Sequence, residues 1–278
     1  MTVVPLPTAQ AVEPLKLWSV TSLLKLGMGT SEPLVNWAVR TTAEGAIDNM
    51  NVVRAMLESG DRQGAVEHLV RLRFRRTKQA MMRGTEIHAA AEAMVMGAAP
   101  PIVAEGNEPY VEQYARWIER FRPTFLMAEA PVYNPVEGYA GTLDGVMELD
   151  GLPVLYDIKT TEHPPGGDRA RPPWPETALQ LVAYARATEV GVISEQRYAG
   201  GKRYYLYDPS AKHEPMPEVA GAFVIVLSPY DCTAIPVRID DEVWRAFRCA
   251  IGCARFNVVT SKSLFGPQLA LREEAPEA

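Results

Sequence analysis

The chain has 278 residues, a formal net charge of −6 and 47% hydrophobic residues. Because only 22% of the residues are charged, the composition excludes an intrinsically disordered chain and allows a sizeable core. No run of about 18 apolar residues is present, so we expect no membrane span. The first residues, MTVVPLPTAQAVEP, lack the basic and apolar regions of a secretory signal. Three cysteines cannot all pair within one chain, which suits a reducing compartment and predicts a cytoplasmic protein.

The first half of the chain is predicted to be mainly helical. Residues 1–17 contain several prolines and are expected to be flexible. Helical periodicity and capping residues predict helices over 19–25, over 42–72 as a pair separated at Gly60, over 77–95 with a break at Gly84, and over 107–121, before Pro123.

The second half alternates short strands with helices. Runs rich in β-branched and aromatic residues predict strands over 126–133, 139–148, 152–159, 203–207, 222–227 and 233–238. Helices are predicted over 176–190 and 240–257, a proline-rich functional loop over 162–175, and a disordered tail over 261–278. We therefore expect one α/β domain over 18–260: a helical part (18–123), a sheet core (124–238) and the C-terminal helix.

Asp150-Gly151 lies between two of these strands and is a strong signal for a tight hairpin. With these two residues as the loop, one face of the hairpin is apolar. It carries four predicted cross-strand pairs: Leu149–Leu152, Met147–Val154, Gly145–Tyr156 and Leu143–Ile158. That face is expected to lie against the core.

The other face of the hairpin carries charges. The same register places Asp144 opposite Asp157 and Thr142 opposite Lys159, although a register slip of one or two residues is an alternative. Like charges directly opposite each other destabilise a sheet. Two carboxylates with a lysine beside them suit a divalent-cation site, in which the ammonium stays outside the ligand shell. A surface salt bridge among the three charges is the structural alternative.

These residues carry a family resemblance. G-x-x-D at 141–144 and D-x-K-T at 157–160 resemble motifs of the PD-(D/E)XK nuclease superfamily, and more narrowly of the RecB-like exonucleases of phages and CRISPR systems. In chain order, GTEIH at 84–88, Glu129 and QLVAY at 180–184 are similar to further elements of that family. The early text WSVTSLLK also looks like that of phage and actinobacterial members, and the matches span about residues 18–230.

The resemblance implies a restriction-endonuclease-like core, in which a mixed sheet is flanked by helices. It implies Mg²⁺ or Mn²⁺ bound by His88, Asp144, Asp157 and the backbone carbonyl of Ile158, with Glu129 as a further candidate ligand. An imidazole ligand favours Mn²⁺ over Mg²⁺. Asp144, Asp157, Lys159, Gln180 and Tyr184 would form the catalytic set: Lys159 would position water or stabilise charge, and Gln180 and Tyr184 would contact the DNA backbone or Lys159.

Candidate DNA contacts come from a basic run and one tryptophan. The run comprises Arg71, Arg73, Arg75, Arg76, Lys78 and Arg83. It predicts a track for phosphates, and a solvated helix face is the alternative. Trp174 is a candidate for stacking on an unpaired base, with core packing as its alternative.

The cysteines depart from the family pattern. Many RecB-like relatives hold an iron–sulfur cluster with four cysteines, whereas here Cys249 and Cys253 are close in sequence and Cys232 stands apart. We therefore expect no iron–sulfur cluster, and we expect these cysteines to be small buried hydrophobes.

Taken together, these residues predict a metal-dependent DNA exonuclease of phage or bacterial recombination, repair or replication, acting in the bacterial cytoplasm. Its expected partners are single- or double-stranded DNA and a recombination or replication protein. Two alternatives stay open: a structure-selective endonuclease on the same core, and a catalytically inactive nucleic-acid-binding protein. The complete set of Asp144, Asp157 and Lys159 argues against the inactive binder.

Overall fold

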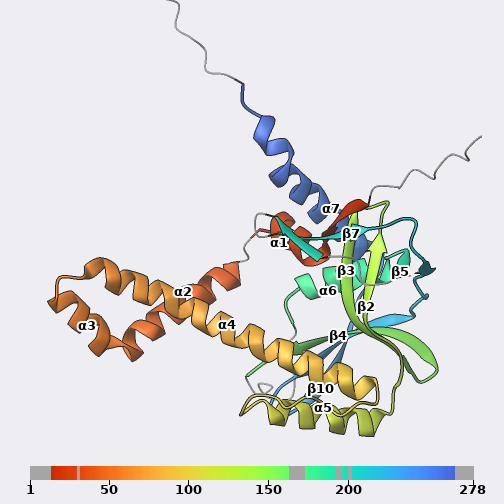
Figure 1. The fold of residues 1–278 in the computed structure, drawn as a ribbon, viewed down its shortest axis with the longest axis horizontal. Helices are drawn as coiled ribbons and strands as arrows, with labels where there is room; N and C mark the ends of the chain where they lie inside the picture. The colour runs from red at the N-terminus through yellow and green to blue at the C-terminus, as the bar shows by residue number, and fades with distance from the viewer. Residues whose placement is uncertain (1–13, 30–31, 163–172, 192–195, 200–201, 267–278) are drawn as a thin grey trace, which may run out of the picture.

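The computed structural model describes residues 14–29, 32–162, 173–191, 196–199 and 202–266. It is a mixed α/β structure with one mixed sheet flanked by helices (Figure 1). The strands are β1 (Leu15–Ser19), β2 (Thr124–Asn134), β3 (Tyr139–Leu149), β4 (Leu152–Thr160), β5 (Glu189–Gly191), β6 (Gln196–Ala199), β7 (Lys202–Tyr207), β8 (His213–Pro215), β9 (Gly221–Leu227) and β10 (Cys232–Val237). The helices are α1 (Val20–Gly27), α2 (Glu32–Asp48), α3 (Met50–Glu58), α4 (Arg62–Val95), α5 (Glu108–Phe121), α6 (Glu176–Ala185) and α7 (Asp241–Val258), followed by the 3₁₀ helix η1 (Thr260–Ser263).

The sheet has the strand order β10-β9-β4-β3-β1-β7-β6; off this path β2 pairs with β3, β5 pairs with β2, and β8 pairs with β5. Among the described strands, only β1 with β3 and β4 with β9 run parallel. The strand β3 is central, because β2 pairs along the length of one of its edges. Its other edge is shared: β1 pairs with Tyr139 and Ala140, and β4 pairs with 145–149. In these pairings, residues 141–144 therefore form a fork in the sheet, where β1 and β4 diverge from β3.

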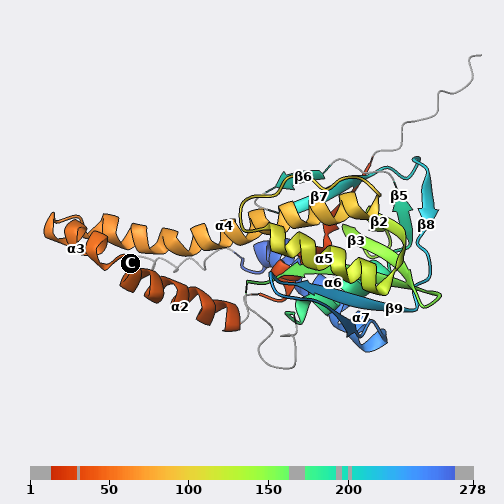
Figure 2. The same cartoon turned by 90° about the horizontal axis from the view of Figure 1, so that it is seen from below.

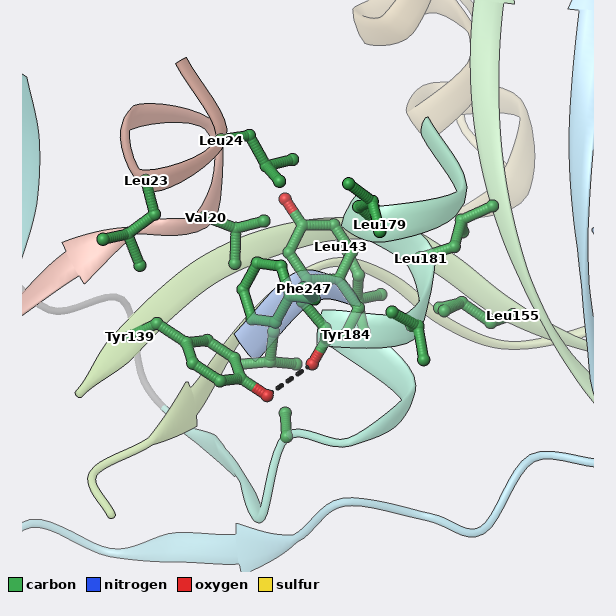
Figure 3. Close-up of a cluster of buried hydrophobic side chains, with 14 of the residues drawn as sticks. Val20, Leu23, Leu24, Tyr139, Leu143, Leu155, Leu179, Leu181, Tyr184 and Phe247 are labelled. Carbon is green, nitrogen blue, oxygen red and sulfur yellow. Dashed lines mark hydrogen bonds between the residues drawn. The ribbon is translucent and has the colours of Figure 1, made fainter. Parts of the chain in front are cut away.

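Two apolar clusters sandwich the sheet. On one side α1, α6 and α7 pack against it through a cluster that includes Tyr139, Leu143, Leu155, Tyr184 and Phe247 (Figure 3). The Tyr139 hydroxyl donates to the carbonyl of Ala183 in α6 at 2.7 Å, so the buried phenol is satisfied. On the other side α4 and α5 cover a cluster that includes Ile87, Met147, Tyr156 and Ile158. Both faces of β4 are thus buried, as is usual for a strand with a parallel neighbour.

The long helix α4 extends beyond this sandwich. Figures 1 and 2 show its N-terminal part projecting from the sheet together with α2 and α3, as a helical arm. Only Thr41, Gly45 and Ala65 are buried among the described side chains from Glu32 to Met82. The arm exposes large apolar residues, with Val39 64%, Ile47 68% and Met81 67% exposed.

Several predicted boundaries differ from the structure. No break occurs at Gly84, because α4 is continuous through it. Three helices occupy the range predicted as a pair over 42–72: the end of α2, all of α3 and the start of α4. The turn at Gly60 is present (φ 81°), and a second break lies at Asn49, whose side-chain amide donates to the carbonyl of Gly45. The helix predicted over 176–190 ends at Ala185, and residues 189–191 pair with β2 as a strand instead.

The ends of the chain and the short strands also differ. Residues 15–17, expected to be flexible, lie in β1, and Ser19 caps α1 by accepting from the Ser22 amide. The strands β6 and β8, of four and three residues, and the first turns of α2 were not predicted. Residues 163–172 of the predicted loop and 267–278 of the predicted tail lie outside the described residues. Within the described residues, no helix combines the length and apolar composition needed to cross a bilayer.

Candidate metal centre

The predicted hairpin register is correct up to Gly145 and Tyr156. Beyond that pair the ladder opens, and the Asp144 carboxylate replaces a backbone partner by accepting from the Ile158 amide at 2.6 Å. One part of the hairpin prediction is wrong: Leu143 packs in the α6 cluster, whereas Met147 packs against α5. The strict alternation of a regular strand is interrupted between these residues, so the single apolar face predicted for the hairpin is limited to its loop end.

Three side chains from three elements converge at the fork. His88 of α4, Glu129 of β2 and Asp144 of β3 each offer a ligand atom within 4.8 Å of the other two. The His88 Nδ1 lies 3.5 Å from Asp144 Oδ2 and 3.7 Å from Glu129 Oε1. Its Nε2 lies 3.0 Å from the carbonyl oxygen of Ile158. The imidazole thus bridges two carboxylates and the backbone oxygen that the resemblance assigns to the metal.

The backbone at Glu129 is unusual. Its φ is 43°, in the left-handed region that non-glycine residues rarely adopt. Its neighbours Ala128 and Ala130 pair regularly with Gly145 and Leu143. Such conformations cost about 1–3 kcal/mol, and strained residues of this kind cluster at functional sites. The strained residue of β2 is therefore the one whose carboxylate lies beside the imidazole of His88.

The charges in this group perturb one another. Burial lowers the pKa of His88, but the neighbouring carboxylates of Glu129, Asp144 and Asp157 outweigh burial and raise it to about 9. Burial, followed by repulsion from the Asp157 carboxylate, raises the pKa of Asp144 to about 7. Without a metal cation, the site therefore holds protons instead, which is the behaviour expected where carboxylates crowd together.

Asp157 lies beside this group and not within it. Its side chain is 2% exposed, and the Lys159 ammonium donates to Oδ1 at 2.8 Å and lies 2.6 Å from Oδ2. Within the described part of the chain, the buried Oδ2 atom has the Lys159 ammonium as its ion-pair partner and makes no hydrogen bond. The Lys159 side chain is 38% exposed, which leaves its ammonium accessible from solvent.

The remaining predicted catalytic residues, Gln180 and Tyr184, lie on α6, which packs against the sheet. The Gln180 amide donates to the Tyr184 hydroxyl at 3.2 Å. Tyr184 is buried against Gly141, where a Cβ atom would overlap its ring. Burial strongly raises the pKa of Tyr184, so its hydroxyl stays protonated. Tyr184 therefore packs against β3 at the fork, whereas Gln180 is only partly buried.

Sequence reasoning missed two neighbours of the site. The Tyr205 hydroxyl of β7 lies 3.3 Å from Thr142 Oγ1, because β1 brings β7 beside β3. Glu162, two residues after the end of β4, pairs with Arg83 of α4 at 2.5 Å. No local pattern indicates Tyr205, and none links Glu162 to Arg83, which lies 79 residues earlier in the chain.

The predicted DNA contacts are only partly described. Arg83 is 14% exposed and lies over the Tyr110 ring, and Arg71 pairs with Glu67 at 3.1 Å on the surface. Lys78 is exposed, and the side chains of Arg73, Arg75 and Arg76 lie outside the described residues. Trp174, just before α6, is 52% exposed.

The prediction that the cysteines are buried is wrong for two of them. Cys249 and Cys253 are exposed, because Phe247, Ala250, Ile251 and Ala254 form the buried face of α7. Cys232 is half-buried, and burial raises the pKa of its thiol to about 12.

The donor set at the fork fits a divalent cation. It offers the carboxylates of Asp144 and Glu129, one imidazole and the carbonyl of Ile158, with Asp157 adjacent. Oxygen donors suit Mg²⁺ and Mn²⁺, and the imidazole shifts the preference towards a transition metal. Both ring nitrogens of His88 face acceptors, so the ring would release a proton to become a ligand.

Comparison with known proteins adds little to this geometry. No family model matches the chain, and no curated protein matches it. Among solved structures, "Crystal structure of SSO0001" aligns with 57% of this chain at 13% identity and a TM-score of 0.29. This chain spans 60% of the length of that structure, and a likeness of this strength carries no argument about fold or function.

Proposed function

We propose that the protein is a divalent-metal-dependent DNA exonuclease with a RecB-like PD-(D/E)XK core. One observation carries the proposal: the fork gathers His88, Glu129, Asp144 and the Ile158 carbonyl, and the Asp157–Lys159 pair lies beside them. The motif order along the chain supports the same assignment. Mg²⁺ or Mn²⁺ is the proposed cofactor, and DNA is the proposed substrate.

In this proposal each residue has a distinct task. A bound cation would polarise the scissile phosphate and lower the pKa of an attacking water. Asp144, Glu129, His88 and Asp157 would hold it. Asp157 also fixes the ammonium of Lys159, which would lie where negative charge grows on the phosphate oxygens. The hydrogen bond from Gln180 to Tyr184 would keep the Gln180 amide oriented beside the fork.

Incubation of the purified protein with Mn²⁺ and end-labelled DNA tests the proposal. An exonuclease should degrade linear DNA and leave covalently closed circular DNA intact, and EDTA should stop the reaction. Cleavage of the circle would favour the structure-selective endonuclease. Binding of DNA without cleavage, in Mg²⁺ and in Mn²⁺, would favour the inactive nucleic-acid-binding protein and overturn the proposed activity.

A further inference from the structure

A second surface lies at the β6 edge of the sheet, away from the fork. The antiparallel strands β1, β7 and β6 are adjacent there, with Trp18 opposite Tyr204 and Tyr204 opposite Arg197. Cross-strand partners project to the same side, as do residues two apart along a strand. One face of this three-stranded region therefore carries five aromatic or basic side chains, which we name the aromatic–basic face: Lys16, Trp18, Arg197, Lys202 and Tyr204.

The two faces of these strands differ in burial. Leu17, Tyr205 and Tyr207 point the other way and are at most 6% exposed. On the aromatic–basic face Lys16 and Arg197 are exposed, and the remaining three side chains are half-buried. An outward strand face normally carries mixed polar residues, yet β1, β6 and β7 contain no acidic residue in a chain of net charge −6. The face is a local concentration of positive charge.

Lys16 on this face lies against aromatic rings and not against a carboxylate. The Lys16 ammonium lies 4.1 Å from the Tyr204 ring centroid and 4.9 Å from that of Trp18. The two rings meet edge to face at 6.3 Å. Neither Lys16 nor Lys202 forms an ion pair among the described residues. Arg71 and Arg83 of the predicted track differ in this respect, since each is paired with a glutamate.

We propose that the aromatic–basic face binds single-stranded DNA. Ammonium groups without a carboxylate partner, such as those of Lys16 and Lys202, attract phosphates, and flat aromatic side chains stack on unpaired bases with little dependence on sequence. The choice of DNA over an acidic protein rests on the proposed nuclease function. Trp18 pairs with Tyr139 and both pack in the cluster of α1, α6 and α7, whereas Asp144 lies against His88 of α4 on the opposite side of the sheet. It is therefore a holding site separate from the site of cleavage.

Fluorescence anisotropy with a labelled 20-mer of thymidine tests the proposal, using the full-length protein in EDTA so that no cleavage occurs. The parent should bind, and Lys16→Glu/Lys202→Glu should bind at least about tenfold more weakly in 50 mM salt. Its log–log salt slope should fall by roughly 0.7 for each phosphate that the protein no longer neutralises. Tyr204→Leu should weaken binding of the 20-mer by about fivefold or more, the equivalent of 1 kcal/mol of stacking free energy.

The matched control is Arg245→Glu/Lys262→Glu, which makes the same change in net charge on the exposed surface of α7 and η1. The control should bind like the parent, and thermal melts should show that all variants fold. Equal weakening by the control, parental binding by the Lys16 and Lys202 variant, or no binding by the parent would each overturn the proposal. Cleavage is measured separately with Mn²⁺. A protein that binds DNA through this face without cutting it would therefore disprove the proposed nuclease activity but not the proposed DNA-binding face.

Discussion

The two halves of α4 carry similar residue types into different surroundings. In the arm, residues 62–82, Glu67 and Arg71 form an ion pair in which the side chains are 51% and 71% exposed. Against the sheet, residues 83–95, His88 meets two carboxylates in a site that raises its pKa to about 9. Surface pairs contribute little to stability, whereas partly buried charges strongly perturb each other. Burial, and not residue type, therefore separates a chemical site from a solvated helix face.

The largest expected effect is on cleavage and contrasts two lysines. Lys159→Ala should lower the cleavage rate at saturating DNA by about 100-fold or more, since one positioned electrostatic group contributes about 3 kcal/mol. Lys78→Ala, in the exposed half of α4, should change only the apparent affinity for DNA. Rates measured over a range of DNA concentrations with Mn²⁺ separate the two. Cleavage by Lys159→Ala within a few-fold of the parent would remove Lys159 from the mechanism.

The next effect concerns metal binding. Mn²⁺ at 100 times its Kd should stabilise the folded parent by about 2.7 kcal/mol, which corresponds to several degrees in Tm. Asp144→Asn removes a charged ligand with almost no change of shape and should lose most of that shift. Glu67→Gln, in the exposed half of α4, should keep it. Melts in EDTA and in Mn²⁺ provide the comparison, and equal Mn²⁺ shifts for the parent and Asp144→Asn would exclude Asp144 as a ligand.

A smaller effect is the pH dependence of the metal-free protein. The pKa of Asp144 is raised from 3.8 to about 7 and that of His88 from 6.5 to about 9. Both groups hold their protons more tightly when folded, so each stabilises the fold below its unfolded pKa and loses that contribution as pH rises through its folded pKa. In EDTA the parent should therefore lose stability relative to Asp144→Asn between about pH 4 and pH 7. A constant difference in Tm across that range would contradict the raised pKa.

The sequence predicted the hairpin and most of the core strands, because turn chemistry and alternation are local. It also indicated His88 and Asp144, which the structure brings together. It did not indicate the fork itself. The fork exists because β1, at the N-terminus, pairs with the start of β3, and only tertiary pairing determines that arrangement. The ion pair of Arg83 with Glu162 and the approach of Thr142 to Tyr205 depend on the same long-range packing.

Two predictions about helices were wrong where a weak local signal competed with tertiary contacts. Cys249 and Cys253 were expected to be buried, yet α7 turns Phe247 and Ile251 to the core and those cysteines to solvent. The break expected at Gly84 is absent because the following turns of α4 pack on the sheet through Ile87 and Ala91. Packing of that kind outweighs the cost of one glycine, about 1 kcal/mol relative to alanine.

Gly84 lies where the two halves of α4 meet, so it tests whether they behave as one rigid helix. A Cβ atom there would have Thr160 Oγ1 as its nearest neighbour at 3.9 Å, which is an ordinary contact. Gly84→Ala should therefore raise stability by about 0.5–1 kcal/mol, or roughly 2 °C in Tm, through helix propensity alone. Cleavage should be unchanged, because His88 already lies against Ile158 in the continuous helix.

Gly252→Ala is the matched control, since Gly252 is an interior glycine of α7 with open space around it. It should give the same small gain in Tm without any connection to the site. If Gly84→Ala gains stability but loses cleavage while Gly252→Ala keeps both, α4 must bend at Gly84 during the reaction. The arm and the metal centre would then be coupled through that bend. Equal gains with unchanged cleavage would instead show that α4 acts as a single rigid element, which holds His88 at the fork independently of what the arm contacts.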